Sequence, residues 1–211
     1  MRLLDLYCGA GGAADGYAQA GFEVVGVDIH PQPHYPYAFF QGDVLKLARD
    51  WIGTFDLIHA SPPCQHFTKY RNVVKDITDR YDDHLAATLE LLAPYPHIVE
   101  NVPGAPMRAD AVLCGSMFGL DVMRHRWFQT SFPVMAPACN HKGWTRQFKS
   151  SSDRPNLRYT IEIGSWDEPL ERQKRAMGIN RPITVRELSE AIPPSYTAFL
   201  GRVFQIQQEA A

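Results

Sequence analysis

The first half of the chain alternates short apolar runs with segments of helical periodicity, and this alternation limits the possible folds more than any other feature. The apolar runs that we interpret as strands cover 3–7, 23–27, 39–43, 55–60 and 97–102. The helical patterns between them cover 13–20, 44–51 and 83–92. Strands that alternate with helices form βαβ units, in which each crossover makes neighbouring strands parallel. The sequence therefore predicts an α/β fold with a doubly wound, Rossmann-like sheet.

The periodicity weakens at about Phe132, and the stretch from there to Arg172 is rich in residues that favour loops. Helical signals return at 184–187, which has capping-box spacing, and at 196–207. A chain of 211 residues is long enough for one well-cored α/β domain with a small appendage. We predict three parts: a core at 1–130, a small irregular segment at 131–176, and C-terminal helices at 177–211 that complete the core.

Charge is unevenly distributed along the chain, although the net charge is only −2. Residues 1–120 carry 8 Lys and Arg against 14 Asp and Glu, whereas residues 121–211 carry 13 against 9. Seven basic side chains are concentrated in one stretch: Arg124, Arg126, Lys142, Arg146, Lys149, Arg154 and Arg158. Such a stretch suits a phosphate backbone, and composition alone allows an ordinary solvated basic face equally well.

No stretch approaches the roughly 18 apolar residues of a membrane span, and Met1 leads into an apolar run without a signal-peptide pattern. We therefore expect a soluble, intracellular protein. The four cysteines lack CxxC spacing, which favours free thiols. Cys139 and His141 resemble half of a metal site, but no second pair lies near them in the sequence, so we expect no metal.

Three successive predicted strands end in residues that suit a nucleotide-like ligand. The first runs into residues 8–12, of sequence Cys-Gly-Ala-Gly-Gly, immediately before a helix. Glycines let the backbone approach a ligand and leave helix N-terminal N–H groups free for an anionic group. Asp28 follows the second strand, where an acid meets ribose hydroxyls, and Asp43 follows the third, where it suits either a helix cap or an adenine amino group. Together these features favour an adenosyl ligand.

A thiol follows the predicted strand at 55–60, in the tetrapeptide Pro62-Pro63-Cys64-Gln65. The two prolines fix two φ angles and remove two backbone donors, so this segment is stiff and cannot join a sheet. A cysteine held in this way is presented at the mouth of a strand. Taken alone, Cys64 is either a nucleophile or a small buried hydrophobic residue.

These motifs, in this order, resemble those of the DNA cytosine-5 methyltransferases, in particular the compact phage and bacterial type. Residues 5–12 resemble the family's S-adenosylmethionine loop, and 62–65 its catalytic loop. Residues 100–102, Glu-Asn-Val, resemble its glutamate motif, and 124–126, Arg-His-Arg, its paired-arginine motif. The resemblance implies a methyltransferase sheet in which 1–130 is the catalytic, cofactor-binding core and 131–176 a reduced target-recognition segment.

The resemblance also implies roles for individual residues. Cys64 would be the nucleophile and Glu100 the acid at cytosine N3, with Asn101 positioning the backbone around it. Arg124 and Arg126 would hold the base carbonyl, Glu100 and a phosphate. The expected contacts to S-adenosylmethionine are Leu6, Tyr7, Gly9, Ala10, Gly11, Gly12, Asp28, Ile29, Asp43, Val44 and Pro62. The target cytosine would be flipped out of DNA, with the polar stretch 66–79, which carries Lys69, Arg71 and Lys75, closing over it.

The chain departs from the family pattern at three places. The segment after Arg126 is short for a target-recognition domain, which implies limited base readout. Val122 stands where the family usually has glutamine. Ser189 and Glu190 replace the usual Gly-Asn, so we expect the Glu190 carboxylate near the ammonium group of the cofactor.

We therefore predict a DNA (cytosine-5)-methyltransferase that acts through a covalent Cys64 adduct, as a monomer in the cytoplasm of a bacterial or phage-infected cell. The catalytic motifs do not distinguish DNA from RNA, so a tRNA-directed enzyme is the first alternative. A catalytically silent DNA-binding subunit is the second. A nicotinamide-dependent oxidoreductase is disfavoured, because residues 9–12 lack GxGxxG spacing.

Overall fold

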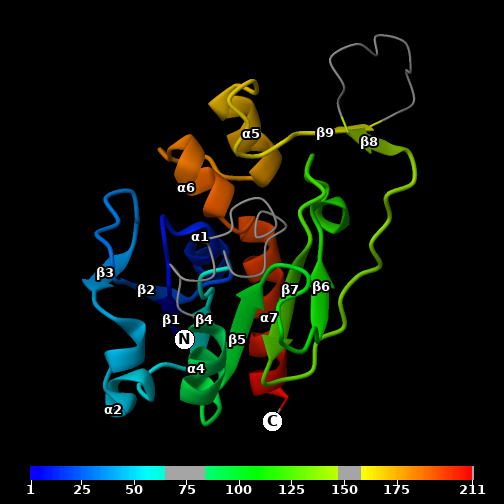
Figure 1. Ribbon diagram of the computed structural model, residues 1–211. Helices are drawn as coiled ribbons and strands as arrows, with labels where there is room; N and C mark the ends of the chain where they lie inside the picture. Colours follow the sequence, from blue (N-terminus) through cyan, green and yellow to red (C-terminus); the bar gives the residue numbers. More distant parts are fainter. Residues whose placement is uncertain (65–83, 147–157, 211) are drawn as a thin grey trace.

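The computed structural model describes residues 1–64, 84–146 and 158–210, with only the backbone described at 145, 146, 158 and 159 (Figure 1). Its main feature is a seven-stranded sheet in the order β3-β2-β1-β4-β5-β7-β6. The strands are β1 (Arg2–Leu6), β2 (Glu23–Asp28), β3 (Ala38–Gln41), β4 (Leu57–Ala60), β5 (His97–Asn101), β6 (Ala111–Leu113) and β7 (Arg126–Thr130). The first five pair in parallel, and β7 pairs antiparallel with both β5 and β6.

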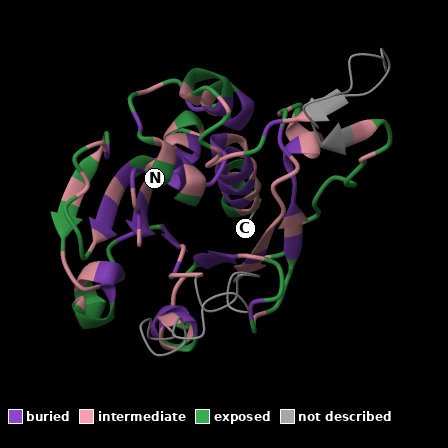
Figure 2. Ribbon diagram, turned by 45° about the horizontal axis from the view of Figure 1, so that its top comes forward, coloured by how far each residue is buried: buried purple, intermediate pink, exposed green. Residues whose placement is uncertain are grey.

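Helices cover both faces of this sheet (Figure 1). Successive side chains of a strand point to opposite faces, so Leu3 packs into one hydrophobic cluster and Leu4 into another. The first cluster includes residues of α1 (Gly12–Gln19) and α7 (Pro194–Glu209). The second includes residues of α2 (Arg49–Ile52) and α4 (His84–Leu92). In Figure 2 the inner strands are largely buried, whereas the edge strand β3 is mostly exposed. The predicted α/β, Rossmann-like architecture is thus confirmed.

The C-terminal helix α7 packs directly on α1. A Cβ at Gly16 would lie 2.0 Å from the Pro194 carbonyl oxygen and 2.1 Å from Thr197 Oγ1. The Thr197 hydroxyl donates to the Ala13 carbonyl at 2.8 Å. This backbone-to-backbone approach brings residues from opposite ends of the chain together beneath the loop that precedes α1.

Several boundaries and elements differ from the sequence-based expectations. The strand expected at 39–43 ends at Gln41, and the helix expected at 44–51 divides into η1 (Val44–Lys46) and α2 because Leu47 between them is extended. The antiparallel strands β6 and β7 were not expected. Strand β6 is a run of only three apolar residues and β7 includes polar residues, so neither gives the longer apolar run by which the parallel strands were recognised.

The segment expected to be irregular contains regular structure. It includes β8 (Trp144–Arg146), β9 (Arg158–Thr160) and α5 (Leu170–Met177). Helix α5 has no conspicuous apolar stripe because one of its three buried residues is Gln173, whose amide bonds Gly164, Ser165 and Glu168. The capping box at 184–187 is confirmed at the start of α6 (Val185–Glu190). Within the described ranges, no helix is long and apolar enough to cross a membrane.

Candidate active site

The loop between β1 and α1 has three left-handed backbone conformations within five residues. The φ angle is 56° at Tyr7, 48° at Gly9 and 88° at Gly11. A Cβ at Gly12 would lie 2.7 Å from the Ile192 carbonyl oxygen, whereas a Cβ at Gly9 would meet no atom within 4 Å. The loop therefore packs against the C-terminal segment at Gly12 and presents open backbone at Gly9, where a ligand can approach closely.

Two carboxylates lie beyond this loop at the ends of neighbouring strands. Asp28 Oδ2 accepts a hydrogen bond from the Gly9 N–H at 3.1 Å, and its Oδ1 accepts from the His30 N–H at 2.9 Å. An ionised carboxylate has about four acceptor sites, so Asp28 retains capacity for a ligand. Asp43 caps η1 by accepting from the Leu45 N–H at 3.0 Å. The capping role considered for Asp43 is therefore present.

The other expected cofactor contacts differ in exposure. Ile29 is 58% exposed directly after β2. Leu6, Ala10 and Val44 are buried, as is Pro62, so their side chains belong to the packed wall of the site. Ile29 is thus the apolar side chain of this group that stands free at the sheet edge.

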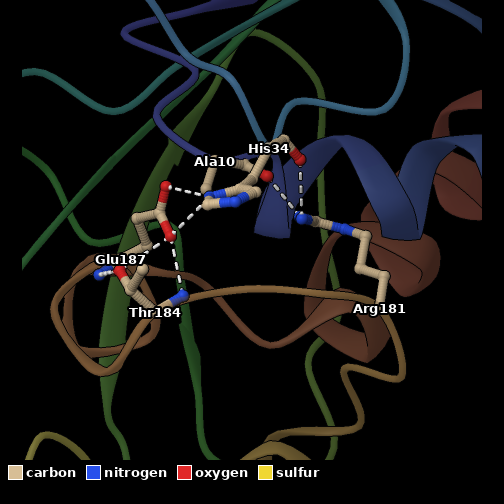
Figure 3. Close-up of polar contacts among 5 residues, drawn as sticks. All are labelled: Ala10, His34, Arg181, Thr184 and Glu187. Carbon is tan, nitrogen blue, oxygen red and sulfur yellow. Dashed lines mark hydrogen bonds and ion pairs between the residues drawn. The ribbon is translucent and has the colours of Figure 1, made fainter.

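Arg181, which was not predicted to belong to the site, holds the glycine loop in place through its guanidinium group. Its guanidinium donates to the His34 carbonyl at 3.0 Å and to the Ala10 carbonyl (Figure 3). It also pairs with Asp15 of α1 at 2.8 Å. The Arg181 and Asp15 side chains are 17% and 13% exposed. One side chain therefore joins the loop, the first helix and the segment that follows β2.

A second contact ties the segment after β2 to the same C-terminal region. His34 Nδ1 lies 2.9 Å and 3.1 Å from the two carboxylate oxygens of Glu187 (Figure 3). Glu187 Oε2 also accepts from the Thr184 backbone N–H and hydroxyl, each at 2.7 Å. The capping box of α6 therefore also anchors the segment after β2.

Cys64 lies half-buried just beyond β4, and Asn101 holds the turn that carries it. The Asn101 Nδ2 donates to the Pro62 carbonyl at 3.2 Å, and its Oδ1 accepts from the Val102 N–H at 2.8 Å. Burial raises the pKa of the Cys64 thiol, and the Glu100 carboxylate raises it further. Two arginines, Arg126 and Arg124, act in the opposite direction. The Cys64 thiol is therefore within electrostatic range of all three charged groups.

Glu100 is a buried acid at the end of β5. Its Oε1 lies 2.9 Å from Nε of Arg126, with the two side chains 8% and 14% exposed. Burial raises the pKa of Glu100 above its ordinary value, against the lowering effect of the two arginines. This shift makes the carboxyl easier to protonate than an exposed glutamate, and in its protonated form it can donate a hydrogen bond to a bound base.

The paired arginines have different partners. Arg126 holds Glu100 and donates to the His125 carbonyl at 2.9 Å. Arg124 donates to the Ser189 carbonyl, while its own carbonyl accepts from the Tyr196 hydroxyl at 2.7 Å. Its Nε is buried and has no hydrogen-bond partner among the described residues. That N–H is a donor that a substrate oxygen could satisfy.

A chain of buried hydrogen bonds connects Tyr17 of α1 to Glu100. It was not predicted from the sequence. Tyr17 OH lies 3.0 Å from His59 Nδ1, and His59 Nε2 lies 2.9 Å from Ser61 Oγ. The Ser61 hydroxyl bonds Glu100. Burial lowers the pKa of His59 to about 3, so the ring is neutral. Every bond is satisfied when Tyr17 donates to Nδ1, the ring donates from Nε2 to Ser61, and Ser61 donates to Glu100.

A cavity of about 660 Å³ lies beside the paired arginines. One wall is formed by residues 122–126, and the facing wall by residues 160–163, 165, 167–169 and 172. Its volume is in the range of pockets that hold small molecules or single nucleotides. The cavity therefore lies between the arginine motif and the expected recognition segment.

Several residues that were predicted to belong to the site are not among the described residues. Gln65 and the stretch 66–79, expected to close over a flipped base, lie outside the described residues. The same holds for Lys149 and Arg154, and for the side chains of Arg146 and Arg158. Glu190 is exposed and lies 3.6 Å from Arg186. Val122 is buried and packs on Gly115.

Comparison with known proteins supports a single family. The family model described as "C-5 cytosine-specific DNA methylase" matches residues 1–108. The curated type II methyltransferase M.AgeI of Thalassovita gelatinovora is 31% identical over 136 residues, which are 57% of this chain. The match spans only 28% of the length of that relative.

Solved structures with the same fold include a DNMT2 variant from Spodoptera frugiperda, with a TM-score of 0.63 at 14% identity. It covers 97% of this chain and 99% of its own. Dnmt2 methyltransferase of S. pombe has a TM-score of 0.61 at 14% identity, and a putative DNA modification methyltransferase from an E. coli prophage has 0.58 at 16%. Each covers 99% of both chains. At these identities the likeness concerns the fold.

The family match covers the glycine loop, the two strand-end carboxylates, the Cys64 turn and Glu100. It extends over 108 of the 211 residues, which is more than half of the sequence. The chain therefore belongs to the C-5 cytosine-specific DNA methylases.

Proposed function

We propose that this chain transfers a methyl group from S-adenosylmethionine to carbon 5 of cytosine in DNA, through a covalent adduct with Cys64. The observation that carries the proposal is the group formed by the Cys64 thiol, the buried Glu100 carboxyl and the arginine that holds Glu100 at 2.9 Å. This group combines a nucleophile with a proton donor at the ends of two adjacent parallel strands, β4 and β5.

The chemistry of cytosine requires both groups. Carbon 5 is a poor nucleophile, so the Cys64 thiolate first adds to carbon 6. Glu100, which its raised pKa makes easier to protonate, donates to N3 as negative charge develops on the ring. Carbon 5 then becomes electron-rich enough to take up the methyl group. Loss of the carbon 5 proton to a water molecule and departure of Cys64 restore the ring double bond.

The residues at the neighbouring strand ends fit S-adenosylmethionine, which when bound supplies an electrophilic methyl group on its sulfonium. Helix α1 has no side-chain cap at its N-terminus, so its first N–H groups can receive the carboxylate of the cofactor. The open backbone at Gly9 allows close approach, and Asp28 has acceptor capacity for ribose hydroxyls. Asp43 and the exposed Ile29 would lie toward the adenine.

The family and the place of the cavity support DNA as the substrate. A cytosine inside a duplex cannot reach Cys64, so the nucleotide must be flipped. The unpartnered Nε–H of Arg124 would satisfy the carbonyl oxygen of the base, while Arg126 keeps Glu100 in place. The cavity between residues 122–126 and 160–172 would receive the nucleotides around the flipped base. The short recognition segment implies a short target sequence.

The direct test is transfer of a radiolabelled methyl group, with duplex DNA and tRNA offered as competing acceptors. We expect label in DNA as 5-methylcytosine, and none with Cys64→Ser, which keeps the shape of the nucleophile. Label in tRNA instead would identify an RNA-directed enzyme. Binding of DNA without label in either acceptor would identify a silent subunit.

A further inference from the structure

Four potential metal ligands converge at the edge of the sheet, away from the glycine loop. They are Cys114 after β6, His125 before β7, and Cys139 and His141 in the segment that leaves β7. Their ligand atoms all lie within 4.8 Å of one another. We expected no metal because no second pair lies near Cys139 and His141 in the sequence. That expectation considered only neighbours along the sequence, whereas the pairing of β6 with β7 brings Cys114 and His125 to them in space.

We propose that Cys114, His125, Cys139 and His141 bind one structural zinc ion. Zinc sites of this kind are tetrahedral, with Zn–S near 2.3 Å and Zn–N near 2.0–2.1 Å, which places sulfur and nitrogen ligands about 3.5 Å apart. Cys139 Sγ lies 3.5 Å from His125 Nε2 and 2.9 Å from His141 Nε2. Cys114 Sγ lies 3.2 Å from His141 Nε2. The four atoms are therefore gathered at close to the spacing that one central ion requires.

The ligand set selects the metal. Two sulfurs and two imidazole nitrogens suit zinc, whereas calcium and magnesium require oxygen ligands. Four protein ligands also close the coordination sphere, which is typical of structural sites and leaves no position for a catalytic water. The Ser116 hydroxyl lies 3.4 Å from Cys114 Sγ and 3.6 Å from Cys139 Sγ. Such a hydroxyl supports thiolates from the second coordination shell.

The surrounding segment has little else to hold it. Between β7 and Trp144, only Phe132 and Val134 pack against the hydrophobic core among the described side chains. Met135 is 93% exposed, and residues 135–140 are all exposed. Because so little apolar area is buried, a metal crosslink would supply the main constraint on this connection to β8.

The site would also fix the arginine motif. His125 lies between Arg124 and Arg126, and its carbonyl accepts from Arg126 at 2.9 Å. An ion bound to the His125 ring would hold this segment at the start of β7. The zinc would thus set the geometry from which Arg126 holds Glu100, without itself touching the substrate.

The test is the metal content of the tag-free protein, purified without chelators and measured by elemental mass spectrometry. We expect about one zinc per chain, and loss of at least nine-tenths of it in the double variant Cys139→Ser with His141→Asn. The matched controls are Cys64→Ser and His30→Asn, which change the same residue types outside the cluster. They should retain the zinc of the unaltered chain.

A second measurement needs no variant and covers the case in which the double variant fails to fold. Alkylation of the zinc-loaded and chelator-treated protein, mapped by mass spectrometry, should show the exposed Cys139 protected only when zinc is present. The proposal is overturned if zinc-supplemented protein holds no stoichiometric metal, if Cys114 and Cys139 form a disulfide, or if the folded double variant keeps its zinc. None of these results depends on methyl transfer.

Discussion

Removal of Arg181 tests whether a single clamp sets the cofactor loop. Arg181→Ala would break the ion pair with Asp15, whose side chain is only 13% exposed, and would release the Ala10 and His34 carbonyls. Breaking a buried ion pair costs about 3–5 kcal/mol. Asp15 keeps a hydrogen bond from Tyr37 at 3.1 Å, so we take the lower limit, about 3 kcal/mol. For a chain of this length that corresponds to a fall in Tm of about 6–12 °C.

The assay pairs thermal unfolding with calorimetric titration of S-adenosylmethionine. We expect cofactor affinity to fall about tenfold in Arg181→Ala, equivalent to about 1.4 kcal/mol, because the loop carbonyl at Ala10 is no longer held. Arg181→Lys should keep the Asp15 pair but recover less than half of the lost stability, since one ammonium cannot reproduce the guanidinium fork. The exposed Arg175→Ala on α5 is the matched control, with an effect below about 0.5 kcal/mol. If Arg181→Ala matches Arg175→Ala in both Tm and affinity for S-adenosylmethionine, the contacts of Arg181 do not hold the loop.

Three further perturbations address the acid and the buried groups around the site. Glu100→Gln keeps a hydrogen-bonding group beside Arg126 but cannot transfer a proton, so we expect methyl transfer to fall about 100-fold; a change below threefold would exclude proton donation. Ser61→Ala removes the link between His59 and Glu100 and should lower the rate by about tenfold while cofactor affinity stays unchanged; an equal loss of affinity would indicate general damage. Burial raises the pKa of Asp5 to about 8 from 3.8. Between about pH 4 and 8 the folded protein holds this proton while the unfolded chain has lost it. The free energy of unfolding therefore falls by about 1.4 kcal/mol per pH unit from this group as pH rises through that range. Urea unfolding of Asp5→Asn should lack that slope, and parallel pH profiles for the two proteins would contradict the assignment.

The parallel half of the fold could be predicted because each strand is a short apolar run that ends in a turn signal. The same signal located Cys64, Glu100 and the glycine loop, since parallel strands bring their carboxyl ends to one edge. His59 was overlooked because a single polar residue within an apolar strand gives no sign of the Tyr17 and Ser61 hydrogen bonds that it makes.

The remaining features depend on contacts that local sequence does not encode. Arg181 acts largely on backbone carbonyls, which any residue supplies, so no pattern marks its partners. Cys114 directly follows β6 and His125 directly precedes β7, so these two ligands meet at one end of an antiparallel pair that no apolar pattern in the sequence marks. Their approach to Cys139 becomes visible only once that pairing is known.

The central claim is that Cys64 attacks carbon 6 of a flipped cytosine, and covalent trapping tests it most directly. Duplex DNA containing 5-fluorocytosine has no removable proton at carbon 5, so the adduct cannot break down after methyl transfer. The account predicts a complex that survives denaturing electrophoresis, requires S-adenosylmethionine, and is absent with Cys64→Ser. An adduct of equal yield in Cys64→Ser, or no adduct from a chain that methylates cytosine in unmodified DNA, would contradict it.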